Sequence, residues 1–134
     1  FRIMSEIKDA NDLKGKSGLR RLINACGYSK DGFIAAYRHE EAFRQEFWLL
    51  ILAVIIACIL PITLMQAVLI VSAHLLLLIV EILNSAVEAV VDRIGPEIHP
   101  LSKRAKDMGS CAVTLTIVLC LIVWFSVLYC AFFT

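Results

Sequence analysis

The charged residues of this chain leave two long segments empty, and this restricts its fold more than any other feature. No Asp, Glu, Lys or Arg occurs between Glu46 and Glu81, a stretch of about 34 residues, and none follows Asp107 in a tail of about 27 residues. A helix needs about 20 apolar residues to cross a bilayer. The hydrophobic share of 60% also exceeds the roughly 45–50% of soluble domains. We therefore predict an all-α integral membrane protein.

The first uncharged segment is too long for a single crossing. At 1.5 Å per residue it would extend about 51 Å, against a hydrocarbon core of about 30 Å. Pro61 interrupts the helical hydrogen bonds near its middle, which predicts two antiparallel helices joined by a short turn. Gly95-Pro96 should end the second helix, and Ser102 is expected to cap the third. The predicted spans are about 43–60, 64–80 with the helix continuing to 93, and 108–130.

The basic residues indicate the orientation of these three spans. Nine of the 13 Lys and Arg residues precede the first span, and the other four lie between Arg93 and Lys106. The Pro61 turn and the C-terminus have none. Because positive charge is retained in the cytoplasm, we expect the N-terminus and the second loop there and the C-terminus outside.

A short amphipathic segment precedes the first span. Its apolar residues follow the i, i+3, i+4, i+7 spacing of one helix face, whereas Arg20 and Arg21 face elsewhere. These apolar residues are Leu19, Leu22, Ile23 and Cys26. We predict a surface helix at about 19–27 in the headgroup region. Gly27 and the segment 29–32 should interrupt the helix before the first span.

The continuation of the second helix beyond the membrane is strongly acidic on one face. At 100° per residue, a stripe about 100° wide contains three carboxylates, an amide and a hydroxyl. These residues are Glu81, Asn84, Ser85, Glu88 and Asp92. A solvated helix face normally mixes Lys and Arg with its acids, so this like-charged row predicts a compensating cation.

The groups predicted at this membrane edge are those of phosphoryl transfer. Carboxylate oxygens suit Mg²⁺ or Ca²⁺, and a lysine such as Lys106 can meet phosphate. Glu40 and Glu41 precede the first span at the same depth, and Lys106 and Asp107 open the third. A carboxylate at an apolar boundary, such as Glu81, can serve as a general base.

Other motifs are weaker. Gly15-Lys16-Ser17 has the ending of a P-loop, but position 10 is alanine where the motif needs glycine, and no apolar strand precedes it. His74 is expected to form an interhelical hydrogen bond or to pack, and not to bind a ligand. The five cysteines form no CxxC pair and are expected to pack as small apolar residues without disulfides.

Four segments of the sequence closely resemble the bacterial diacylglycerol kinase family. They are Val80-Glu-Ile-Leu-Asn-Ser-Ala-Val-Glu-Ala-Val-Val-Asp-Arg-Ile-Gly95, Arg104-Ala-Lys-Asp-Met-Gly-Ser110, Ala42-Phe-Arg-Gln-Glu46 and Ala25-Cys-Gly-Tyr-Ser29. The resemblance covers residues 19–134 as one membrane kinase domain and leaves 1–18 as an N-terminal extension. His74, Glu41 and Pro100 depart from the family pattern.

The resemblance implies a lipid kinase of the bacterial inner membrane with a role in phospholipid metabolism. Such an enzyme transfers the γ-phosphate of Mg-ATP to the hydroxyl of 1,2-diacylglycerol and forms phosphatidate. The resemblance makes Glu81 the general base and Glu40 and Glu88 the Mg²⁺ ligands. It implies nucleotide contacts from Arg21, Tyr28, Glu40, Asn84, Glu88, Glu97, His99, Lys106 and Asp107. It implies lipid contacts from Arg21, Ala42, Phe43, Arg44, Gln45, Glu46, Glu81 and Ser110. It also implies a homotrimer with shared active sites.

Two alternatives remain open from the sequence. One branch of the same family phosphorylates undecaprenol, and the wording around Arg93–Gly95 and Asp107–Ser110 favours diacylglycerol over it. The other alternative is a non-enzymatic channel or transporter subunit. That function predicts polar residues along the membrane depth, and the spans contain few of them. No feature of the sequence indicates a nucleic-acid partner.

Overall fold

The computed structural model describes residues 18–134, and it confirms the predicted fold class. These residues form four helices and no strand: α3 (Gly18–His39), α4 (Glu41–Ile59), α5 (Leu64–Ile94) and α6 (Pro100–Phe133). The last three are long and apolar enough to cross a membrane. Gly15-Lys16-Ser17 and the rest of the N-terminal extension before Gly18 lie outside the described residues.

The chain divides into two units, residues 1–35 and residues 36–134, and each is described by itself. In the first unit, the predicted helix break at Gly27 and residues 29–32 is absent, because α3 continues through both. Neither Gly27 nor Gly32 is next to a proline, and a single glycine reduces helix stability by only about 1 kcal/mol. Leu19, Leu22 and Ile23, which belong to the predicted apolar face, are more than 60% exposed.

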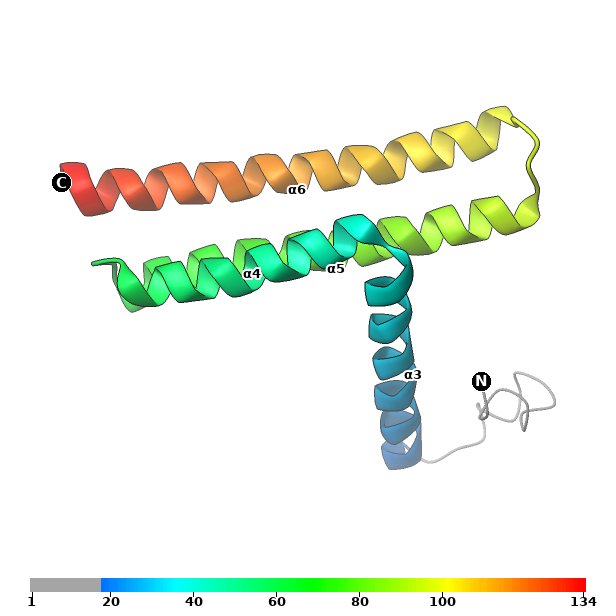
Figure 1. The fold of residues 1–134 in the computed structure, drawn as a ribbon, viewed down its shortest axis with the longest axis horizontal. Coiled ribbons are helices and arrows are strands. Elements are labelled where there is room, and N and C mark those ends of the chain that lie inside the picture. Colours follow the sequence, from blue (N-terminus) through cyan, green and yellow to red (C-terminus); the bar gives the residue numbers. More distant parts are fainter. Residues whose placement is uncertain (1–17) are drawn as a thin grey trace. The chain divides into compact units, whose positions relative to one another are not determined.

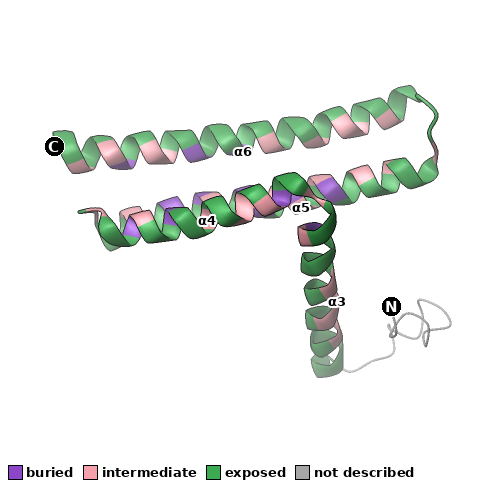
Figure 2. Ribbon diagram, viewed as in Figure 1, coloured by how far each residue is buried: buried purple, intermediate pink, exposed green. Residues whose placement is uncertain are grey.

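In the second unit, α5 packs against both α4 and α6, and α6 runs back along α5 toward the C-terminus (Figure 1). The helix contacts use small residues where the backbones approach, as is common in membrane helix pairs. One buried cluster comprises Ala53, Ile70 and Val127, and a second comprises Ala73, Leu77 and Cys120. Most of the remaining helix surface is exposed (Figure 2).

The turns lie where the sequence predicts them, but one cap differs. Helix α4 ends at Ile59 just before Pro61, and Thr63 begins α5 with a capping box to Gln66. Gly95 ends α5 with φ 156° and ψ 167°, a conformation open almost only to glycine. Helix α6 is capped by His99 and not by Ser102, since Pro100 suits the first helical position and the His99 Nδ1 atom accepts a hydrogen bond from the Leu101 N–H.

A side-chain hydrogen bond joins α5 and α6 in the half of the bundle away from the acidic stripe. The Trp124 indole donates a hydrogen bond to His74 Nε2 at 2.8 Å, and the two rings meet edge to face. His74 therefore forms an interhelical hydrogen bond, one of the two roles that the sequence left open for it. Since Nε2 accepts, the ring proton must sit on Nδ1 in the neutral imidazole.

This hydrogen bond should affect stability and not catalysis. We expect Trp124→Phe and His74→Leu each to destabilise the helix bundle, with a coupling of about 0.5–1.7 kcal/mol between them, the range measured for hydrogen bonds between membrane helices. Unfolding by a denaturing detergent in a double-mutant cycle measures this coupling. A coupling near zero would show that the two rings only pack.

Candidate active site

The acidic stripe lies at the level where α3 gives way to α4. Glu40 is the extended residue between these helices, and its side chain makes no capping hydrogen bond. The junction is held by Arg44, whose guanidinium Nη1 donates to the carbonyl oxygens of Tyr37 at 2.8 Å and Arg38 at 3.1 Å. These contacts satisfy carbonyls that the end of α3 leaves unpaired. Arg44 thus fixes the position of Glu40 at the entry to α4.

Glu81 is the most enclosed carboxylate of this level. Its residue is only 6% exposed, and Ser85, one turn further along α5, is 8% exposed. Charged residues are rarely buried without a partner. Two other acids, Glu88 and Glu40, repel the Glu81 carboxylate. A buried acid in an acidic environment is typical of a functional group, because such an arrangement costs stability.

Glu46 on α4 completes the acidic cluster. Its carboxylate is repelled by Glu81, and its Oε2 atom is buried without a hydrogen-bond partner among the described residues. The acidic stripe of α5 therefore lies near a carboxylate of α4. From the sequence, the position of Glu46 relative to Glu81 was not predictable, because it depends on the register of α4 against α5.

Asn84 and Glu88 form a small polar unit, about one and two turns from Glu81 along α5. The Asn84 Nδ2 atom donates to Glu88 Oε1 at 3.4 Å, whereas Asn84 Oδ1 is buried and has no hydrogen-bond partner among the described residues. The amide oxygen lies where a Cβ atom at Gly109 of α6 would be. Gly109 therefore gives Asn84 its room, which sequence analysis did not identify. A glycine inside a long helix is the signal that could have indicated it.

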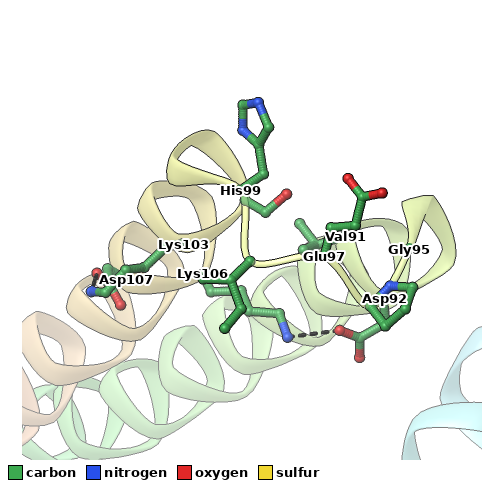
Figure 3. A pocket seen from close by; sticks show the side chains of 11 residues that line it. Val91, Asp92, Gly95, Glu97, His99, Lys103, Lys106 and Asp107 are labelled. Atoms are coloured by element: carbon green, nitrogen blue, oxygen red, sulfur yellow. Dashed lines mark hydrogen bonds and ion pairs between the residues drawn. The ribbon is translucent and has the colours of Figure 1, made fainter.

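A hollow of about 280 Å³ lies beside the stripe, at the connection between α5 and α6. Its lining includes seven polar residues. Four of them, Glu97, His99, Lys106 and Asp107, were predicted to contact a nucleotide, whereas Asp92, Ser102 and Lys103 were not. Figure 3 shows these side chains around the α5–α6 connection. The Lys106 ammonium pairs with the Asp92 carboxylate at 2.7 Å, and Lys103 pairs with Asp107 at 2.6 Å. Lys106 is thus a cation beside the acidic row.

The other predicted site residues differ in burial and in the unit to which they belong. Phe43 is 1% exposed and packs against Ala36 and Leu78, so it belongs to the core. Ala42, Gln45 and Ser110 are exposed. Arg21 and Tyr28 lie on α3 in the first unit. The structure therefore brings the carboxylates of Glu40, Glu46 and Glu88 near Glu81, while the contributions from α3 stay predictions.

The donor set of this level fits a hard cation bound together with phosphates. Among residues 18–134, no three His, Cys, Asp or Glu side chains gather as a ready metal cage. Mg²⁺ in phosphoryl-transfer sites typically takes one or two carboxylates and completes its shell with phosphate and water. Glu40 and Glu88 supply oxygen donors of that kind near the buried Glu81.

The sequence is similar to known proteins over most of its length. The sequence profile of the prokaryotic diacylglycerol kinase family matches residues 27–128. The diacylglycerol kinase of Escherichia coli K12 is 53% identical over 116 residues, which are 87% of this chain and 95% of that protein. The Pseudomonas aeruginosa protein of the same name is 47% identical over 86% of this chain and 94% of its own, and that of Helicobacter pylori 26695 is 37% identical over 80% and 84%.

Together with three helices long and apolar enough to span a membrane, these matches place the protein among the multi-pass proteins of the bacterial inner membrane. The profile covers most of the chain and includes every residue of the acidic stripe. The chain belongs to the prokaryotic diacylglycerol kinase family.

Proposed function

We propose that this kinase transfers the γ-phosphate of ATP to the free hydroxyl of 1,2-diacylglycerol and releases phosphatidate and ADP. The observation that carries the proposal is the buried Glu81 carboxylate, held among acids at the polar end of the helices. The names of its relatives support the lipid substrate, and a kinase family implies ATP as the co-substrate. A buried carboxylate that other acids repel suits proton abstraction from a neutral hydroxyl.

In the proposed step, a Glu81 carboxylate oxygen accepts the proton of the lipid hydroxyl. The hydroxyl oxygen then forms a bond to the γ-phosphorus as the bond from that phosphorus to the β–γ bridging oxygen breaks, and ADP leaves with the electron pair. The low exposure of Glu81 limits competition from water as an alternative acceptor. Ser85, buried one turn along the same face, lines the same level of α5.

Glu40 and Glu88 are the residues that would hold Mg²⁺. When bound, the ion neutralises the charge that builds up on the transferring phosphate. The Asn84 amide keeps the Glu88 carboxylate in place through its hydrogen bond. Glu97, His99, Lys106 and Asp107 would bind the nucleotide from the hollow, with Lys106 as the phosphate-facing cation. Arg21 and Tyr28 of α3 would contribute further nucleotide contacts.

The lipid side and the orientation follow from where the charges lie. About 26 Å of helix separates Leu64 from Glu81, close to the thickness of the hydrocarbon core. A lipid hydroxyl at the interface would therefore lie level with Glu81. The exposed residues Ala42, Gln45 and Ser110, with Arg44 and Glu46, would border the lipid, and Phe43 supports them from the core. The N-terminus and the site would be cytoplasmic and the C-terminus outside.

We propose that the enzyme is a homotrimer with shared active sites. Three helices in which only α5 contacts both others leave broad exposed apolar faces. A second copy of the chain could also complete a level at which Glu46 Oε2 and Asn84 Oδ1 lack hydrogen-bond partners among residues 18–134. Mixing two inactive variants altered in different site residues tests whether the active sites are shared. Recovered activity in the mixture supports shared sites, and a mixture that stays inactive contradicts them.

The activity itself is tested by ATP consumption in mixed micelles with Mg²⁺, with diacylglycerol, with undecaprenol and with neither. We expect turnover on diacylglycerol with phosphatidate as the product. Turnover on undecaprenol alone would change the assigned lipid substrate and leave the assigned reaction, phosphoryl transfer, in place. Flux of ions or solutes without ATP turnover would favour the non-enzymatic alternative.

Gly109 gives a prediction that separates catalysis from folding. In Gly109→Ala, the new Cβ collides with Asn84 Oδ1, and the flexible amide can rotate away. Alanine also favours a helix interior over glycine by about 1 kcal/mol, so thermal stability should stay unchanged or rise. Turnover should fall about 10- to 100-fold, because a displaced positioning group misaligns the reactants.

Kinetics and thermal unfolding of the two variants test this together. Gly32→Ala is the matched control, since a Cβ there meets open space, and its turnover should stay within about twofold of the unaltered chain. In an Asn84→Ala background, Gly109→Ala should have no further effect. A fall in turnover that persists there would contradict the role of the Asn84 amide.

A further inference from the structure

One ion pair joins different helices at the polar end of the bundle. The Lys106 Nζ atom of α6 lies 2.7 Å from the Asp92 Oδ1 atom of α5. The other ion pair between described residues, Lys103 with Asp107, lies within α6. Asp92 is the carboxylate of the acidic stripe to which the family resemblance gave no role. Figure 3 shows its carboxylate and the Lys106 ammonium meeting at the edge of the hollow.

The pair fixes where a flexible cation lies. A lysine side chain has a flexible stem of four carbons and loses much rotamer freedom when its ammonium is fixed in one place. Asp92 lies one turn beyond Glu88 on the same face of α5, and Glu88 attracts the same ammonium. Asp92 therefore holds Lys106 by direct contact, and Glu88 one turn away adds only a weaker attraction. Without Asp92, the ammonium would be free to extend into solvent from α6.

The chemistry of the pair leaves Lys106 able to bind phosphate. An ammonium has three N–H donors, and one contact with Asp92 leaves others for phosphate oxygens. Both side chains are substantially exposed, at 44% for Lys106 and 67% for Asp92. Exposed ion pairs are weakened by water and contribute little to stability. The pair is therefore better suited to directing a cation than to holding the two helices together.

We propose that Asp92 is a positioning residue for ATP, which holds the Lys106 ammonium at the hollow so that its remaining N–H groups meet the phosphates. The inference rests on the proposed function, because it takes Lys106 as a phosphate-binding cation. Asp92 acts through Lys106 and does not itself contact the nucleotide. Its loss should therefore weaken ATP use at low concentration more than it slows the chemical step.

The test is a double-mutant cycle in the full chain, assayed in mixed micelles with diacylglycerol. We expect Asp92→Asn to raise the KM for ATP about five- to tenfold, the size of coupling that paired residues commonly show, with kcat changed less than about twofold. Asp92→Glu should restore most of the affinity. In a Lys106→Gln background, which itself has a raised KM, Asp92→Asn should change KM less than about twofold. Arg93→Gln is the control for a lost charge on the same turn and should keep the KM.

The outcomes separate the inference from the proposed function. If the unaltered chain turns over and Lys106→Gln raises the KM, but Asp92→Asn does not, the positioning role alone is overturned. Additive effects in the double variant also overturn it, because Asp92 would then act independently of Lys106. Lys106→Gln with an unchanged KM removes the phosphate role of Lys106 and the inference with it, while Glu81 as base is tested separately. Asp92→Ser is the second variant, and failure of both to fold would assign Asp92 a structural role instead.

Discussion

Glu81→Gln should retain the fold and lose turnover. Glutamine keeps the shape of the side chain but cannot accept the hydroxyl proton, and a general base commonly contributes about 10²–10⁴-fold to the rate. Glu81 is buried among acids that repel it, so neutralising it should not destabilise the helix bundle. Turnover with saturating diacylglycerol and ATP, together with unfolding in denaturing detergent, measures the two effects separately.

The matched control for this variant is Glu41→Gln. Glu41 is an exposed carboxylate at the start of α4, and its contact in the structure is with Gln45 of the same helix. Its turnover should stay within about twofold of the unaltered chain, as is usual for exposed positions away from a site. Near-normal activity in Glu81→Gln would show that another group takes the proton.

Glu88→Gln should change the magnesium requirement of the enzyme. The glutamine amide oxygen of this variant could still accept the Asn84 hydrogen bond but would bring no charge to a hard cation. Changing residues that merely support metal ligands commonly costs about 10- to 100-fold in affinity or activity, and loss of a ligand should cost at least as much. We expect a rise of that size in the Mg²⁺ concentration for half-maximal turnover. A titration with Mg²⁺ at fixed ATP measures it.

A fall in turnover with an unchanged Mg²⁺ dependence would contradict the ligand role of Glu88. Glu41→Gln again serves as the control, because it removes a carboxylate near the same helix ends without touching the acidic stripe. Its Mg²⁺ dependence should match that of the unaltered chain. Excess Mg²⁺ should partly restore Glu88→Gln and leave Glu81→Gln inactive, which separates binding of the ion from transfer of the proton.

The sequence by itself determined the helices and the polar end of this protein. Two uncharged segments longer than a bilayer span allow few structures other than membrane helices, since lipid offers no partner for an open backbone. Pro61 and Gly95 mark turns because proline breaks the helical ladder and glycine alone adopts the backbone that ends α5. The helical period of 3.6 residues placed Glu81, Glu88 and Asp92 on one face without any structure.

Local sequence signals were a weaker guide to helix breaks and helix caps. The helix break expected at Gly27 and residues 29–32 does not occur, because a helix tolerates isolated glycines and turn residues when its neighbours favour helix. Ser102 does not cap α6, since Pro100 already begins that helix and His99 provides the cap. These end effects depend on which of several adequate residues is used, and the differences between them are small.

Only the tertiary structure decided which residues of different helices meet. Glu46 against Glu81, the Asn84 amide in the space left by Gly109, the Asp92–Lys106 ion pair and the Trp124–His74 hydrogen bond all depend on the register between helices. Helical periodicity fixes the face that a residue occupies but not the height at which a neighbouring helix presents its partner. That height is set by how small residues such as Ala53 and Ala73 let the backbones pack, and packing is a property of the helix pair that neither sequence segment contains alone.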